Sequence, residues 1–424
     1  MSQAPRKTGL FRPPVLLALL VAFGLLGYVL FPRARVAVGV ADFGGWFLDS
    51  YAVLAAVEAH RAGLDPAAPN PYDPLLRPHR YSDWWLTAGA ALGLSREHNF
   101  VVGTGWVALF LAAVLVTVRP AGRGEALWFA LLLLSPSVLQ GVLRANNDLV
   151  IFSVLAPAVW ALRVPSPGRR VLAVAALALA TGLKFYPVVG IAALLGVRPG
   201  TVLRRTLLLG GAGLAGVLSL VAAQMTRGIF PIEVTVHVWG ARLWPEALGW
   251  ASGTGALAVG GVGLLGLVAG WRWLAPVGTN GAAAGFALAA ALLAACFVAG
   301  LNYGYRWVFA VWLGPWLWQV WRDRAAAAGL RRLAMALLVL VPWLLWQDGL
   351  LCAAVNLGWL AVAPADFGPL QHGWRLLTQP LVWVSMGLLA GWLGAWLRAG
   401  GVALRSTDQR ATGRTDSTAA SQSV

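Results

Sequence analysis

Acidic residues are concentrated between the first two apolar segments of the chain. Residues 42–98 contain seven of its 16 acidic residues: Asp42, Asp49, Glu58, Asp65, Asp73, Asp83 and Glu97. A carboxylate can act as a general base that takes a proton from an attacking hydroxyl group. Because apolar segments flank this stretch and acids are rare elsewhere, we expect any acid–base chemistry of the protein to take place there.

Asp49 lies in the first turn of a predicted amphipathic helix over residues 46–62. The apolar positions of this helix recur at helical spacing, which is typical of a helix lying on a membrane surface. A carboxylate in the first turn is favoured by the helix dipole. Asp49 is therefore either a partner of that dipole or, given the polar groups around it, a catalytic carboxylate.

A proline-rich run follows this helix between Asn70 and Tyr81. Its prolines are incompatible with a regular helix and predict a rigid segment rich in turns. Arg77 and Arg80 in this run could hold a phosphate, with Tyr81 as a further substrate contact. Alternatively, the two arginines form ion pairs with Asp73 and Asp83 and stabilise the loop.

Further polar residues lie within or beside the later apolar segments. Asn146, Asn147 and Asp148 begin one segment. They could cap a helix, but two consecutive asparagines exceed what a cap needs and favour ligand contact. Lys184 lies at membrane depth, where a charge costs about 2.5–3.5 kcal/mol and needs a phosphate or a carboxylate as partner. Arg306 is a second cation at the end of a segment, and its alternative role is to reach the lipid headgroups.

The composition indicates the class of protein that carries these residues. Of the 424 residues, 59% are hydrophobic and 11% are charged, and the mean hydropathy is +0.72. A soluble core cannot bury so many apolar side chains, so the sequence predicts an all-α polytopic membrane protein. The net charge of +16 does not indicate binding to nucleic acid, because the basic residues cluster in loops between apolar segments.

Apolar stretches of about 20 residues predict about 12 membrane segments. The expected segments are two half-helices between Arg170 and Arg198 and residues 13–31, 100–118, 125–143, 148–162, 206–225, 251–270, 282–301, 307–321, 334–347 and 380–397. Both flanks of the stretch from Arg170 to Arg198 are basic and so cytoplasmic, and half of it is too short to cross the hydrocarbon core. We therefore expect the two half-helices to meet at Lys184 and to line a cavity there.

The distribution of basic residues predicts the topology. Twenty of the 32 Lys and Arg residues fall on one side of the segments, which places both termini in the cytoplasm. The large loop at residues 32–99 and two further loops, 226–250 and 348–375, are then extracytoplasmic. We expect a single membrane domain over residues 1–405, followed by a disordered cytoplasmic tail at 406–424.

Metal and nucleotide signatures do not accompany the acids. The sequence has no Gly-rich phosphate loop, no zinc-ligand spacing and no Ser-His-Asp arrangement. Cys296 and Cys352 are expected to be buried free thiols, because their spacing matches neither a metal site nor a disulfide framework. No cofactor is required by these patterns, and a divalent cation, Mg²⁺ or Mn²⁺, stays open as an aid to a phosphate-containing substrate.

Together these elements resemble the GT-C class of polytopic glycosyltransferases, and within it glycosyltransferase family 87 (the domain of unknown function 2029 group). The similarity rests on Asp49 with Tyr51-Ala52, the turns at residues 63–66 and 70–74, and the element Leu183-Lys184-Phe185-Tyr186-Pro187. Related bacterial sequences are also similar at Ser135-Pro136, Arg144-x-Asn146-Asn147-Asp148 and Tyr305-Arg306. The similarity covers most of the chain up to Trp321.

This resemblance implies transfer of a sugar, a mannose-like hexose or a pentose, from a polyprenyl-phosphate donor to a glycan or lipid acceptor. The reaction would proceed with inversion on the extracytoplasmic face of a bacterial inner (plasma) membrane, among its lipids. The resemblance implies Asp49 as the base, with Asp42 as the alternative. The expected substrate contacts are Glu58, Arg77, Arg80, Tyr81, Asn146, Asn147, Asp148, Lys184, Tyr186, Tyr305 and Arg306.

Two other functions are compatible with the sequence. Half-helices that meet inside the membrane are also a feature of transporters and would suit a lipid or glycan flippase. Against a transporter, the sequence shows no inverted repeat, and its large polar loop lies on one face only. The third alternative is a non-catalytic relative that binds a lipid-linked glycan.

Overall fold

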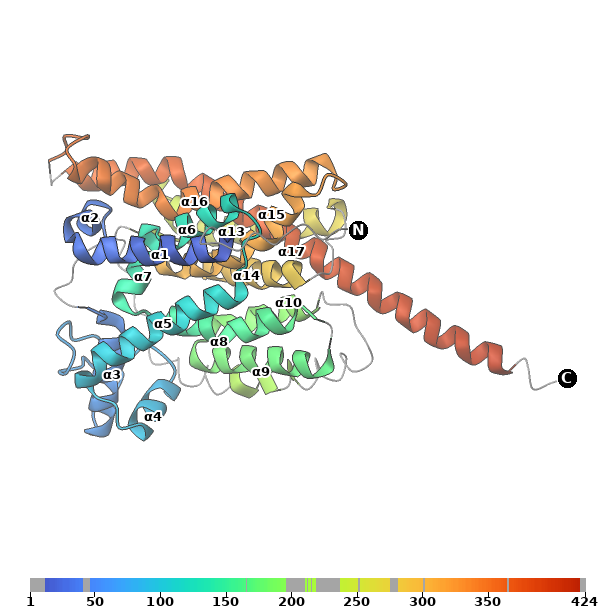
Figure 1. Ribbon diagram of the computed structural model, residues 1–424, viewed down its shortest axis with the longest axis horizontal. Coiled ribbons are helices and arrows are strands. Elements are labelled where there is room, and N and C mark those ends of the chain that lie inside the picture. Colours follow the sequence, from blue (N-terminus) through green and yellow to red (C-terminus); the bar gives the residue numbers. More distant parts are fainter. Residues whose placement is uncertain are drawn as a thin grey trace.

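The protein is described here by a computed structural model (Figure 1). It describes residues 12–40, 46–164, 166–195, 210, 211, 213, 214, 216–218, 237–250, 252–274, 281–299, 302–363 and 366–419. Asp42, the alternative base of the sequence analysis, and most of the predicted segment at 206–225 lie outside the described residues.

Helices dominate the described part of the chain (Figure 1). Five of them are long and apolar enough to cross a membrane, or six spans result if one bent pair is counted as a span. The five are α1 (Pro13–Leu30), α5 (Asn99–Thr117, preceded by the 3₁₀ helix η1, Arg96–His98), α14 (Gly281–Val298), α16 (Ala328–Asn356) and α17 (Phe367–Ala419). The prediction of an all-helical membrane protein is confirmed at this level.

The bent pair consists of α6 (Arg123–Leu133) and α7 (Pro136–Arg144), which are inclined by 58°. The bend lies at Ser135-Pro136, where the sequence predicts an interruption. The Ser135 hydroxyl accepts a hydrogen bond from the Val138 N–H and so caps α7, while Pro136 occupies its first position. The end of α7 is thereby directed toward the polar loop.

A second break lies at Lys184, as the sequence predicts. α9 (Pro167–Leu183) ends immediately before this residue, whose backbone is extended. The 3₁₀ helix η2 (Tyr186–Gly190) and α10 (Ile191–Leu195) follow. Pro187 cannot continue the α9 hydrogen-bond ladder, because it has no N–H group. The Lys184 side chain at this break contacts α8 (Asn147–Ala161), where it binds Asp148.

A short two-stranded antiparallel sheet joins distant parts of the chain. β1 (Val238–Trp239) pairs antiparallel with β2 (Asn302–Tyr303). β2 leads directly into the 3₁₀ helix η3 (Gly304–Leu313) and then into α15 (Gly314–Arg322), so the segment predicted at 307–321 is not one regular α-helix. After β1 come α12 (Leu243–Ala247) and α13 (Ser252–Trp273).

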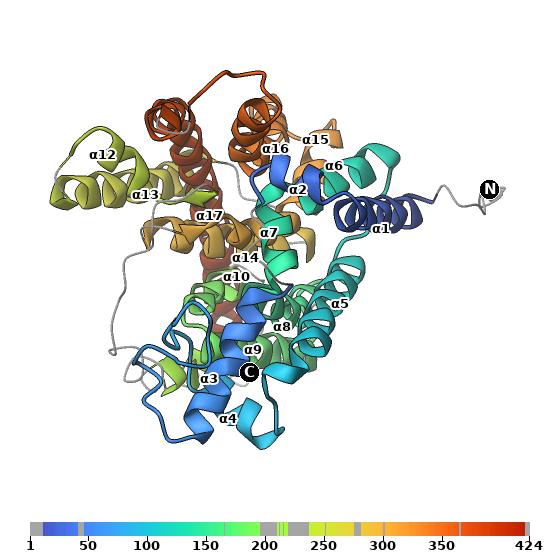
Figure 2. The same cartoon turned by 90° about the vertical axis from the view of Figure 1, so that its left-hand side faces the viewer.

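The predicted amphipathic helix in the first large loop is present as α3 (Leu48–Arg61). α2 (Pro32–Ala37) precedes it and α4 (Trp84–Ala91) follows it. Figure 2 looks onto the end of the molecule that carries these helices, with α3 and α4 below α7 and α8. The run from Asn70 to Tyr81 forms turns rather than a helix, since side chains within it accept hydrogen bonds from backbone N–H groups two residues further on.

The predicted extent of the loop at residues 348–375 is wrong. α16 continues to Asn356 and α17 begins at Phe367, so Asp348 and Arg375 lie inside helices. The two charges interact with each other, which removes the reason for taking each as a helix boundary. At the other end, α17 extends to Ala419, past residue 406 where the sequence predicts a disordered tail.

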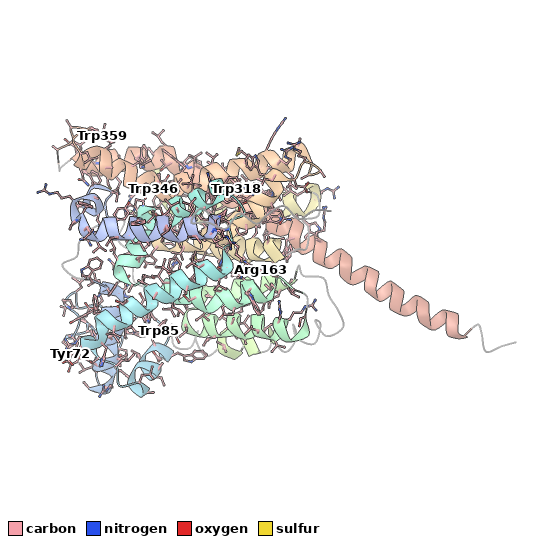
Figure 3. The ribbon with its side chains drawn as sticks, viewed as in Figure 1. Tyr72, Trp85, Arg163, Trp318, Trp346 and Trp359 are labelled. Atoms are coloured by element: carbon pink, nitrogen blue, oxygen red, sulfur yellow. The ribbon has the colours of Figure 1, made fainter. Side chains whose placement is uncertain are left out.

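Labelled side chains lie toward both ends of the bundle. Tyr72 of the turn-rich run and Trp359, which follows α16, lie at one end, whereas Arg163 lies toward the other (Figure 3).

We expect Leu75→Cys, at a side chain that is 55% exposed, to react with a membrane-impermeant maleimide added outside intact cells. Ala325→Cys, at an exposed position after α15, should react only after permeabilisation.

Cys296 and Cys352 are buried free thiols, so the unsubstituted protein provides the labelling control. Labelling of Ala325→Cys in intact cells would contradict the predicted orientation.

Candidate functional site

The candidate site is built around the turn between α7 and α8. Ala145 adopts a left-handed conformation with φ of 43°, which reverses the chain after Arg144. Asn146 then caps α8, because its side-chain oxygen accepts a hydrogen bond from the Asp148 N–H at 2.8 Å. The cap leaves the amide Nδ2 group of Asn146 free to bind elsewhere, and it presents Arg144, Asn146, Asn147 and Asp148 within one turn.

Asp49 of α3 is bound to this turn, although 95 residues separate it from Arg144. Arg144 holds both carboxylate oxygens: Nε lies 2.9 Å from Oδ2 and Nη2 lies 2.6 Å from Oδ1. Asn146 Nδ2 donates to Oδ2 at 2.7 Å. Arg77 Nη1 lies farther away, 3.4 Å from Oδ1. A two-point guanidinium–carboxylate pair of this kind fixes both position and orientation.

The charges around Asp49 determine its protonation. Burial by itself would raise the pKa of Asp49, but the charge of Arg144 and the hydrogen bonds from Arg144 and Asn146, with a smaller contribution from Arg77, outweigh burial. The pKa of Asp49 is therefore lowered below its ordinary value. The carboxylate stays ionised, and its oxygens are occupied by these donors.

Arg77 connects Asp49 to the turn-rich run. Its Nε donates to Asp73 Oδ2 at 2.9 Å and its Nη2 donates to the Leu48 carbonyl at 2.9 Å. The ion pair with Asp73 was one of two alternatives for Arg77 in the sequence. It is present, and Arg77 reaches Asp49 as well, so this arginine both stabilises the loop and adds charge to the site.

A second group of charges surrounds Asp148. Its Oδ1 accepts hydrogen bonds from Lys184 Nζ at 2.6 Å and from the Tyr186 hydroxyl at 2.7 Å. Lys184 also donates to Asn147 Oδ1 at 3.0 Å. Arg306 Nε of η3 lies 3.6 Å from Asp148 Oδ2. The partner that Lys184 requires inside the membrane is therefore a carboxylate of this protein.

Three polar atoms of this group lack hydrogen bonds. Asn147 Nδ2, Asp148 Oδ2 and Arg306 Nε are buried and have no hydrogen-bond partner within the described part of the chain. Asn147 and Asp148 are 1% and 0% exposed. Asp148 Oδ2 and Arg306 Nε face each other as an ion pair at 3.6 Å, whereas Asn147 Nδ2 has no partner among the described residues. A ligand beside these atoms would complete their hydrogen bonding.

Tyr81 and Tyr305 connect the two groups of charges. Tyr81 interacts with both Asp49 and Asp148, and its ring centroid lies 5.4 Å from Lys184 Nζ. Burial, followed by the negative charges of Asp49 and Asp148, raises the pKa of Tyr81, which stays a neutral hydroxyl group. Tyr305 interacts with the same two carboxylates. The candidate residues from the loop, from α8, from the Lys184 break and from η3 thus form one site.

The site has an excess of positive charge. Its cations are Arg77, Arg80, Arg144, Lys184 and Arg306, and its carboxylates are Asp49, Asp73 and Asp148, which gives 5 − 3 = +2. Arg80 belongs to the set through its interaction with Tyr81. An excess of two positive charges suits a phosphate-containing ligand.

Glu58 is not brought to this site. Its carboxylate accepts hydrogen bonds from the Arg96 backbone N–H at 2.6 Å and from Arg96 Nε at 2.8 Å, while Arg96 also donates to the Tyr72 carbonyl. Glu58 therefore joins α3 to the turn-rich run and to the start of α5. Arg144 is the residue that sequence reasoning omitted from the site, since an arginine at a helix end is usually read as a membrane-interface residue.

Tryptophans of α4 hold the Lys184 break in place. The Trp84 ring lies against Gly182, where a side chain would collide with it. Trp85 Nε1 donates to the Leu183 carbonyl at 3.0 Å and so satisfies a group at the end of α9. The loop helix α4 thereby fixes the end of α9 immediately before Lys184.

Among the described residues, no group of three or more His, Cys, Asp or Glu side chains could hold a metal ion. Comparisons with protein-family models, with curated proteins and with solved structures find no match to this chain.

We expect Lys184→Met to lower the free energy of unfolding by about 3–5 kcal/mol, because it leaves the Asp148 carboxylate buried without its ammonium partner. Adding Asp148→Asn should recover only part of that loss, because Arg306 then also loses its carboxylate partner. Denaturant unfolding of the purified protein measures both variants.

The matched control is Arg242→Gln, which removes an exposed ion pair with Glu246 and should change stability by less than about 1 kcal/mol. A double variant no more stable than Lys184→Met would show that the pair is not coupled.

Proposed function

We propose that this protein is a polytopic membrane glycosyltransferase that resembles the GT-C class, and family 87 within it. It transfers a hexose or pentose from a polyprenyl-phosphate donor to a glycan or lipid acceptor. One observation carries the proposal. Asp49, a carboxylate of the polar loop, lies beside an excess of cations at the turn where α7 ends and α8 begins. Such a site offers a base for the acceptor and a counter-charge for the departing phosphate.

The proposed setting is the inner (plasma) membrane of a bacterium, with about 12 segments and both termini in the cytoplasm. In this topology the loop at residues 32–99 faces outward, so the reaction takes place on the extracytoplasmic face. The positions of α3 and α4 at one end of the bundle (Figure 2) support this arrangement.

In the proposed reaction, the acceptor hydroxyl attacks the anomeric carbon of the donor sugar from the side opposite to the phosphate. The new bond joins the acceptor oxygen to that carbon, and the bond from the carbon to the phosphate oxygen breaks. The phosphate leaves with the bonding electron pair, and Asp49 receives the acceptor's proton. Lys184 and Arg306 would stabilise the charge that develops on the phosphate.

Arg144 has a specific part in this proposal. Both oxygens of Asp49 are occupied by Arg144 and Asn146, so an acceptor hydroxyl must take the place of one of these donors. A donor phosphate would compete with Asp49 for the Arg144 guanidinium, because a carboxylate and a phosphate each present two oxygens that a guanidinium binds at once. Donor binding would thus release the base when it is needed.

One observation favours a second candidate, a transporter or flippase. The helix break at Lys184 lies within an apolar stretch, and broken helices of this kind bind substrates in transporters. Flux of a fluorescent lipid-linked sugar across proteoliposomes, without glycosidic bond formation, would support that candidate. Binding without either flux or transfer would support a non-catalytic glycan-binding protein.

We expect Asp49→Asn to reduce transfer from a radiolabelled polyprenyl-phosphate sugar by about 10²–10⁴-fold, the range of a general base. Binding of the donor should be retained, because the cations of the site are unchanged. Asp42→Asn is the matched control and should keep its activity. Loss of transfer in Asp42→Asn alone would move the base to that residue, and full activity in both variants would refute general-base catalysis by either.

The lowered pKa of Asp49 predicts a pH dependence. Transfer should persist at pH values below the ordinary carboxylate range and fall only as the pH drops through the lowered pKa. Arg144→Gln removes the largest charge that opposes burial, so it should raise the pKa of Asp49 and move the acid limb of the kcat/KM profile to higher pH. Arg144→Lys, which keeps the charge, should move it less. An unshifted acid limb in Arg144→Gln would mean that Asp49 is not the titrating base.

A further inference from the structure

A second group of buried and half-buried polar side chains lies on α16 and α17, at the same end of the molecule. Asp348 is eight residues before the end of α16 at Asn356, and Arg375 is eight residues after the start of α17 at Phe367. Since a helix rises about 1.5 Å per residue, both lie about 12 Å from the outer ends of their helices. The two charges interact at this matched depth.

Amide and indole groups lie close to this pair along the two helices. Gln347 precedes Asp348 and is 3% exposed, and Gln379 lies one turn after Arg375 and is 1% exposed. The Oε1 atoms of both glutamines have no hydrogen-bond partner within the described residues. The rings of Trp343 and Trp374 lie 6.2 Å apart across the two helices, and neither indole N–H has a partner in the described part of the chain.

His237, which immediately precedes β1, borders the group on a third side. It is 2% exposed, and its φ of 60° is unusual for a residue other than glycine. Its backbone N–H interacts with Asp348, and burial lowers the pKa of its ring to about 4, so the ring is neutral. The His237 carbonyl accepts a hydrogen bond from the Gly304 N–H, two residues before Arg306. The group therefore adjoins the element that carries a cation of the candidate site.

The group is electrically balanced, in contrast to the candidate site. Arg375 interacts with Asp348 and with Glu246 of α12, and Glu246 also pairs with Arg242. Two cations and two carboxylates give 2 − 2 = 0, so the group offers no net charge to a phosphate. It offers neutral donors and acceptors beside aromatic ring faces. This combination matches a ligand with many hydroxyl groups and an apolar C–H face, which is a saccharide.

We propose that α16, α17 and His237 form a second binding site, and that its ligand is a saccharide unit. Hydroxyl groups of the sugar donate to Gln347 and Gln379 and accept from the indole N–H groups, and the C–H face of the sugar packs on Trp343 or Trp374. We also assign this saccharide to the acceptor, and that step alone rests on the proposed function. Figure 2 shows α12, α16 and α17 grouped on one side of the end that carries α3 and α4 on the other.

The test measures binding of methyl α-mannoside to the full chain in a detergent that contains no sugar. Saturation-transfer NMR detects binding, and the shift of the thermal unfolding midpoint with glycoside concentration measures its strength. Gln379→Leu removes the unpaired acceptor, so the ligand-free protein should unfold at an equal or higher temperature while affinity for the glycoside falls at least tenfold. Trp374→Phe, which keeps an aromatic ring but lacks the N–H, should also weaken binding.

Ser385→Ala is the matched control, because among the described residues the Ser385 hydroxyl binds only the Leu381 carbonyl of its own helix, and its loss should not affect the glycoside. Unchanged affinity in both Gln379→Leu and Trp374→Phe, or no binding by the unsubstituted protein, would overturn the proposal. Competition by inorganic phosphate would also overturn it, because the ligand would then be an anion. Asp49→Asn should lose transfer and keep glycoside binding. Binding in a protein without any transfer activity would refute the proposed function and leave this site standing.

Discussion

The ion pair between Asp49 and Arg144 is the interaction on which the candidate site depends. A carboxylate that is 6% exposed cannot stay ionised without compensation, and Arg144 with Asn146 supplies it at both oxygens. The pair joins the polar loop to the C-terminal end of α7. The need to neutralise this buried charge therefore helps to hold the loop over the bundle. The same pair occupies the carboxylate oxygens that Asp49 would use as a base. In the proposed reaction, Asp49 can therefore act only when another anion binds Arg144 in its place.

The turn at Ala145 extends this constraint to the second carboxylate. Asn146 caps α8 with its oxygen and binds Asp49 with its nitrogen, while Asp148, two residues later, binds Lys184 and Tyr186. One residue with a left-handed backbone thereby holds two buried ion pairs close together. The break after α9 is stabilised from both directions, by Asp148 on the inside and by the α4 tryptophans on the loop side. Rigid elements thus surround the atoms that lack hydrogen bonds.

Charges inside the helices also have partners away from the candidate site. Asp348 and Arg375 lie inside α16 and α17, where the charge of each offsets part of the cost of burying the other. The neighbouring glutamine oxygens and indole N–H groups have no hydrogen-bond partner among the described residues, which is the feature of a place prepared for a ligand. The two polar regions also differ in net charge, since one favours an anion and the other a neutral molecule.

The sequence by itself determined that this is a helical membrane protein, and it located the breaks at Ser135-Pro136 and Lys184 and the helix that carries Asp49. These features depend on local hydropathy and on proline geometry, which a single stretch of residues contains. Only the tertiary structure decided which charges are partners: Arg144 binds Asp49, Glu58 binds Arg96 instead of joining the site, and Asp348 meets Arg375 inside two helices that the sequence would have ended there. Pairing of buried charges depends on distances between residues far apart in the chain, and those distances are fixed by packing.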